Sequence, residues 1–262
     1  MLSIVSTIIK RHSLLTFFIL AYALSWCLVP WVGPSLLPWG PALAAIIMIA
    51  LIEGKPGLKS WLSQMGRWRV GFQWYLIALS LPILTSLSAA WLNILFGAVS
   101  RPVEPWYNFL LLIPLFIMIG GEWEEPGWTG YALPRLQRGR SALTASLIMA
   151  VFRVGWHLPL FWYGSVPGSD ILFMSAAQIV ITWLYNSTRH SVLIIMVLHL
   201  MMNVCGEFFG PLFSSGDAAN FAWLKAGFFV VVAIGLIIWA GPTHLSGRSR
   251  IYNAIGEPVV RG

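Results

Sequence analysis

The stretch NFLLLIPLFIMIGGEWEEPGWTGYALPRL, residues 108–136, joins an apolar run directly to a cluster of three carboxylates. The run 108–119 is typical of a membrane span, yet Glu122, Glu124 and Glu125 follow it within six positions. The whole chain shares this bias, because 58% of its 262 residues are hydrophobic and only 10% are charged. Such a composition lies outside the range of soluble domains and predicts a polytopic membrane protein.

Eight segments meet or approach the roughly 20 apolar residues that a helix needs to cross a bilayer. The sequence therefore predicts an all-α fold of about eight transmembrane helices in one domain, residues 1–262. The predicted spans are 13–32, 39–53, 74–96, 106–133, 142–163, 171–187, 191–206 and 223–239.

The Lys and Arg residues indicate which side of the membrane each loop faces. With both termini cytoplasmic, thirteen of the sixteen basic residues lie on the inner side, only Arg101 and Lys225 lie in outer loops, and Arg153 lies within a span. This split follows the positive-inside rule and predicts a cytoplasmic tail at 241–262. The formal charge of +7 does not indicate a nucleic acid partner, because the basic residues are scattered between spans.

The connector between the second and third spans has helical apolar spacing. Leu58, Trp61, Leu62 and Met65 recur on one face, and basic residues surround them. This pattern predicts a helix in the headgroup plane of the inner leaflet.

Ionisable residues inside spans are costly and usually face the protein interior. Besides the glutamates, the fifth span holds Arg153 and His157, and the seventh holds His199 and Asn203. Each pair is spaced i, i+4 and projects from one helix face. We expect these residues to share a cavity that opens inward.

Together these residue types could hydrolyse a peptide bond. Glu124 could act as a general base on a water shared with His157, while His199 and Asn203 donate hydrogen bonds to a developing oxyanion. The same residues could instead form a proton or ion pathway. A purely structural interpretation is that one of the other acids neutralises Arg153.

The residue types also allow a metal site. Glu124, His157 and His199 have the ligand types of a His₂Glu zinc site, although the helical H-E-x-x-H signature is absent. The sequence leaves zinc and a metal-free mechanism equally open.

Three motifs, taken in order, resemble those of the CPBP family (CAAX protease and bacteriocin-processing, or Abi) of intramembrane endopeptidases. They are E-E-P-G-W-T-G-Y-A-L-P-R-L at 124–136, W-H-L-P-L-F at 156–161 and H-L-M-M-N at 199–203. W-G-P-A-L-A-A at 39–45 also resembles that family's second span. The motif-bearing core is therefore expected at about 106–206.

The resemblance implies an endopeptidase, of metallo- or glutamate type, in the inner (plasma) membrane. It implies cleavage of membrane-associated peptides or proteins near the cytoplasmic leaflet. In such proteins Glu124 and His157 would activate water, His199 and Asn203 would stabilise the oxyanion, and Glu125 would be a supporting acid. The alternative function is that of a catalytically inactive CPBP-like membrane scaffold or bacteriocin-immunity protein. Neither the substrate nor the oligomeric state can be read from the sequence.

Two positions depart from the family motifs. The pattern E-E-x-x-x-R meets Thr129 in place of its arginine, and F-x-x-x-H meets Arg153 in place of its phenylalanine. Our hypothesis treats them as one exchange, in which Arg153 reaches Glu125 or Glu122 and supplies the missing positive charge.

Overall fold

The computed structural model describes residues 10–102, 105 and 107–247, so residues 248–262 of the predicted tail lie outside it. Within this part every regular element is helical, and the only strand-like pairing is an isolated bridge between Ser100 and Phe213. The all-α prediction is confirmed. Among the described residues, four helical segments are long and apolar enough to cross a membrane: Ser13–Val32, Phe72–Leu95, Val192–Leu212 and Gly216–Ala240. The count of eight spans and the sidedness of the termini remain predictions.

The chain forms two groups of helices joined by an irregular middle segment. The first group is α2 Ser13–Trp26, α3 Val29–Val32, α4 Gly40–Ile52, α5 Gly54–Met65, α6 Phe72–Leu95 and α7 Asn108–Ile119. The middle segment is a 3₁₀ turn Gly121–Glu124, α8 Glu125–Gly127, a π-helical turn Trp128–Ala132 and α9 Leu133–Leu136. The second group is α10 Ala142–Trp156, α11 Leu158–Trp162, α12 Ser169–Ser187, α13 Val192–Phe209, a 3₁₀ turn Gly210–Leu212 and α14 Ser215–Ala240.

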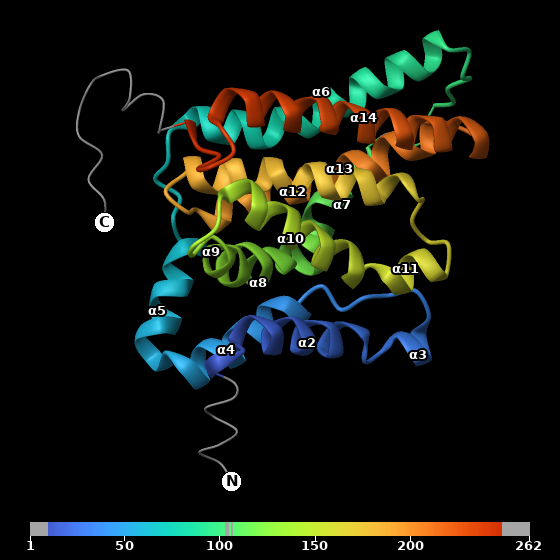
Figure 1. The fold of residues 1–262 in the computed structure, drawn as a ribbon. Coiled ribbons are helices and arrows are strands. Elements are labelled where there is room, and N and C mark those ends of the chain that lie inside the picture. Colours follow the sequence, from blue (N-terminus) through green and yellow to red (C-terminus); the bar gives the residue numbers. More distant parts are fainter. Residues whose placement is uncertain (1–9, 103–104, 106, 248–262) are drawn as a thin grey trace, which may run out of the picture.

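The helices pack side by side in layers. Figure 1 shows α6 and α14 on one side, α12 and α13 next to them, α8, α9 and α10 in the centre, and α2 with α4 on the opposite side. The helix α5 crosses one end of the bundle, and α3 and α11 lie at the other end. The prediction of a helix in the 58–65 connector is therefore confirmed, while its depth in the membrane stays a prediction.

The middle segment lies at the centre of the packing. Every residue from 124 to 133 is buried. The ring of Phe17 packs edge-on against Trp128 and also contacts Tyr131, and Phe18 stacks on Phe152 with ring centroids 3.7 Å apart. The motif-bearing residues are thus held by helices from both groups.

Two serine caps fix where two helices begin: α10, which ends just before His157, and α13, which contains His199. The Ser141 hydroxyl accepts a hydrogen bond from the Thr144 N–H at the start of α10, and the Ser191 hydroxyl accepts one from Ile194 at the start of α13. Each cap satisfies a backbone donor that a helix start leaves open.

Candidate active site

The predicted span 106–133 is not one continuous helix, and this prediction was wrong. The helix α7 ends before Gly120, whose backbone is extended, and the chain continues as short 3₁₀, α and π turns. Adjacent glycines and Pro126, which has no N–H to donate, weaken a regular helix here. The Trp123 indole donates to the Ile117 carbonyl at 2.9 Å, which satisfies an acceptor freed by the break. The break places the acids at a turn inside the bundle.

The predicted span 142–163 is also broken, at His157. The helix α10 ends at Trp156, and α11 starts with Pro159 in its first turn. The Nδ1 of His157 lies 2.8 Å from the Arg153 carbonyl oxygen. A carbonyl only accepts, so Nδ1 carries the proton and Nε2 of the neutral ring is left as an acceptor.

Glu125 is held by four contacts and is fully buried. Its Oε1 accepts from Arg153 Nη1 and from His199 Nδ1, both at 2.7 Å. Its Oε2 accepts from Arg153 Nη2 at 3.1 Å and from the Thr129 hydroxyl at 2.5 Å. Thr129 and Arg153, the two residues that depart from the family motifs, therefore both donate to the Glu125 carboxylate. The contact that the exchange hypothesis required is made with Glu125, whereas the buried Glu122 has no hydrogen-bond partner among the described residues.

Glu124 is held on one side only. Its Oε2 accepts from the Trp128 indole at 3.2 Å and lies 3.8 Å from Arg153 Nη1. Its Oε1 makes no hydrogen bond or ion pair with any residue that the structure describes, and it faces the backbone of Gly121. Glu124 therefore keeps one oxygen for chemistry, while Glu125 keeps none.

Three polar groups converge on Gly121. A Cβ built on this glycine would lie 3.0 Å from Glu124 Oε1, 3.1 Å from His199 Nε2 and 3.2 Å from Asn203 Nδ2. Two atoms that share such a point are roughly 6 Å apart or less, a gap that one water can bridge with two hydrogen bonds. A side chain at position 121 would press on all three groups, so this close approach requires glycine.

The same groups face a cavity of about 330 Å³. Glu124, His157, His199 and Asn203 line it, together with Gly121. Four of the five predicted site residues thus share one cavity, while Glu125 sits behind it and contacts His199.

Comparison with known proteins bears on this arrangement. Residues 105–205 match the family described as type II CAAX prenyl endopeptidase Rce1-like. The chain is also 30% identical over 106 residues to CAAX prenyl protease 2 of Methanococcus maripaludis. This alignment covers 35% of the chain and 38% of that relative, so the likeness spans well under half of either protein.

Residues 105–205 therefore resemble the Rce1-like CAAX prenyl endopeptidase family.

The cavity beside Gly121 extends toward one end of the bundle. Its outer lining includes Val166 and Asp170 near the start of α12 and the exposed Glu207 near the end of α13. This end is opposite to α5 (Figure 1). The charge distribution predicts that the α5 end faces the inner side, and the side on which the cavity opens stays a prediction.

The residues of the candidate active site do not fit a metal centre as they are arranged. A zinc site needs at least three His, Cys, Asp or Glu donors around one point. Throughout the described residues, no three such side chains come together in a way that could hold a metal ion. The expected ligands Glu124, His157 and His199 therefore do not form a site here, and no chemical step below uses a metal.

Sequence reasoning missed three residues of the candidate active site. Gly121 has no side chain to draw attention, and only its neighbours in space reveal its place. Gln178 accepts a hydrogen bond from Arg153 Nε at 3.1 Å. In the sequence, the feature that could have revealed it is a polar residue within an apolar run. Lys225 lies within α14 and lines the cavity, with Nζ 4.5 Å from the ring centroid of Phe173. Its placement in an outer loop was wrong.

Proposed function

We propose that the protein is an intramembrane endopeptidase that hydrolyses peptide bonds of membrane-associated peptides or proteins. The observation that carries this proposal is the convergence of Glu124 Oε1, His199 Nε2 and Asn203 Nδ2 beside Gly121, at the wall of a cavity. A base with one unengaged oxygen and two nitrogen groups at hydrogen-bond range are what hydrolysis of an amide requires. The CAAX protease names of the matching family and relative support the same reaction class.

In the proposed reaction Glu124 takes a proton from a water that His157 Nε2 also holds. The resulting hydroxide adds to the peptide carbonyl carbon, and the carbonyl oxygen becomes an oxyanion. When the carbon–nitrogen bond breaks, Glu124 returns the proton to the leaving amine, so the carboxylate is regenerated. Glu124 serves first as base and then as acid.

The oxyanion would be stabilised by groups from α13. Asn203 Nδ2 donates directly, and His199 Nε2 donates when its ring carries a second proton. Glu125, 2.7 Å from His199 Nδ1, stabilises that charged ring. Arg153 in turn fixes Glu125, so both are positioning residues that act through His199.

The cavity limits what can be cut. A volume of about 330 Å³ accommodates a few residues of an extended chain and excludes a folded domain. We therefore propose a flexible segment, such as a chain terminus, as the substrate. The names of the matching proteins make a C-terminal CAAX sequence the first one to test.

The test uses the full chain reconstituted in phospholipid vesicles. Fluorescence-quenched peptides with a farnesylated CAAX terminus, their unprenylated counterparts and a mixed peptide library are supplied, and cleavage positions are read by mass spectrometry. Glu124→Gln is expected to lower kcat about 10³-fold, the range of general-base catalysis.

The matched control is Glu122→Gln, which removes a buried carboxyl two residues away that does not line the cavity. It should keep wild-type turnover. Equal rates in the two variants would refute the assignment of Glu124. No cleavage of any peptide by the wild type would favour the inactive scaffold or immunity protein.

A further inference from the structure

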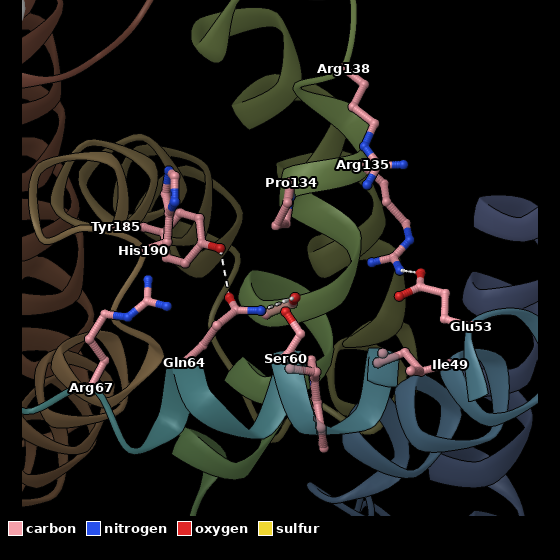
Figure 2. A pocket seen from close by; sticks show the side chains of 13 residues that line it. Ile49, Glu53, Ser60, Gln64, Arg67, Pro134, Arg135, Arg138, Tyr185 and His190 are labelled. Atoms are coloured by element: carbon pink, nitrogen blue, oxygen red, sulfur yellow. Dashed lines mark hydrogen bonds and ion pairs between the residues drawn. The ribbon is translucent and has the colours of Figure 1, made fainter. Parts of the chain in front are cut away.

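A second cavity, of about 280 Å³, lies beside α5, the helix that crosses one end of the bundle (Figure 1). It is bounded by α5, by the π turn with α9, and by the loop between α12 and α13. Figure 2 shows its lining side chains, among which three are arginines: Arg67, Arg135 and Arg138. None of the lining residues belongs to the proposed catalytic groups.

The charges of this cavity do not cancel. Glu53 forms an ion pair with Arg135 (Figure 2), and that arginine also donates to the Tyr131 carbonyl and stacks on its ring. Within the described part of the chain no acid pairs with Arg67 or Arg138. The cavity therefore carries two guanidinium groups without an acidic counterpart.

The two guanidinium groups differ in what else they do. Arg67 donates to the Arg189 carbonyl and so anchors the loop to α5. The side chain of Arg138 is exposed and makes no hydrogen bond or ion pair with any described residue. All of the donors of Arg138 remain for a ligand, and a guanidinium matches the oxygens of a phosphate group in geometry.

Neutral groups beside the arginines are already ordered. The Tyr185 hydroxyl donates to Gln64 Oε1 at 2.8 Å, and Gln64 Nε2 lies 3.4 Å from the Gly130 carbonyl (Figure 2). The Trp61 indole donates to the Pro126 carbonyl at 2.8 Å and fixes α5 against the middle segment. A ligand would meet a wall that is preorganised.

The loop at the edge of the cavity is held in an unusual backbone conformation. Arg189 and His190 both have positive φ, at 56° and 62°, although neither is a glycine. Such conformations cost free energy and persist where surrounding contacts fix them, commonly at functional sites. The Arg67 contact with the Arg189 carbonyl supplies that restraint.

The surroundings indicate where the ligand comes from. On α5, Leu62 is exposed, as is Trp68 just after it, whereas Trp61 is buried. An amphipathic helix with exposed apolar side chains next to basic groups is typical of the membrane headgroup region.

We propose that this cavity binds a phosphate group, which either the headgroup of an anionic lipid or a free phosphate ion can supply. The net positive charge selects an anion, and the volume accommodates a phosphate with a small substituent such as glycerol.

The experiment measures binding by the full chain in detergent, through the shift in thermal unfolding temperature at increasing ligand. Three probes are compared at constant ionic strength: dioctanoyl phosphatidylglycerol, dioctanoyl phosphatidylcholine and inorganic phosphate. Arg138→Gln should raise the dissociation constant of the anionic probe about tenfold, as expected for loss of a charged hydrogen-bond donor.

The matched control is Arg69→Gln, which removes the same charge from an exposed arginine that does not line the cavity. It should bind like the wild type. Binding of phosphatidylglycerol alone identifies a lipid headgroup, and equal binding of inorganic phosphate identifies the phosphate group itself. Equal affinity for phosphatidylcholine, equal affinity in the two variants, or no binding of either anionic probe would overturn the proposal.

Discussion

Replacing Gly121 with alanine tests the geometry of the candidate active site with the smallest possible change. The added methyl carbon would lie 3.0–3.2 Å from Glu124 Oε1, His199 Nε2 and Asn203 Nδ2. These distances are only a few tenths of an ångström below an ordinary carbon contact, so the fold can absorb the methyl by small movements of three side chains. The same movements displace the base and both oxyanion donors at once.

The expected loss of activity is much larger than the loss of stability. Small misplacements of reacting groups, or loss of one oxyanion donor, cost about 10²-fold in kcat, which is about 2.7 kcal/mol of transition-state stabilisation. Because Gly121 does not have a positive φ, alanine should change the free energy of unfolding by only about 1 kcal/mol. Peptide turnover in vesicles and thermal unfolding in detergent measure the two quantities.

Gly206→Ala is the matched control for this substitution. Gly206 lines the same cavity, but a Cβ there would meet no atom within 4 Å. It should keep wild-type kcat. Wild-type kcat in Gly121→Ala would show that the three groups are not the reacting ones, and an equal loss in both variants would show that any added bulk in the cavity is harmful.

Three further predictions follow from the packing and the site. Arg153→Phe should abolish turnover and destabilise the fold by about 3–5 kcal/mol, because it leaves the buried Glu125 carboxylate without its positive partner. Adding Thr129→Arg to Arg153→Phe should restore turnover. A double variant as inactive as the single one would contradict the exchange. Gly127→Ala should lower the unfolding temperature strongly, because the added Cβ would lie 2.3 Å from the backbone carbonyl of Pro41. The control Gly168→Ala should leave the unfolding temperature unchanged, because a Cβ there would meet no atom within 4 Å. Equal unfolding temperatures in the two variants would contradict this packing. Treatment with 1,10-phenanthroline should leave peptide turnover unchanged, and an inhibition that added zinc reverses would contradict the metal-free arrangement.

The sequence predicted uninterrupted helices well and interrupted ones poorly. The predicted spans 74–96 and 171–187 correspond to helices 72–95 and 169–187, because apolar runs bounded by glycine, proline or serine mark both ends. Hydropathy does not register a backbone break, so the extended Gly120 and the helix end at His157 were both missed. Both breaks carry site residues, where local sequence preferences and function diverge.

The candidate site was predictable only through its ionisable groups. The spacing of Arg153 with His157, and of His199 with Asn203, put each pair on one helix face, and the structure places all four at the same cavity. Helical spacing says nothing about which backbone the pairs approach, so the convergence on Gly121 required coordinates.

The two motif departures make physical sense only when they are considered together. Glu125 is fully buried, so its charge must be balanced by a partner within the bundle. The Thr129 hydroxyl contacts Oε2 from one turn away on its own segment, while the Arg153 guanidinium spans both oxygens from α10. An arginine at position 129 beside Arg153 would direct two guanidinium groups at one carboxylate and leave one of them buried without a partner. Thr129→Arg alone should therefore be as damaging as Arg153→Phe alone, even though the first adds the family's residue and the second removes a departure from it.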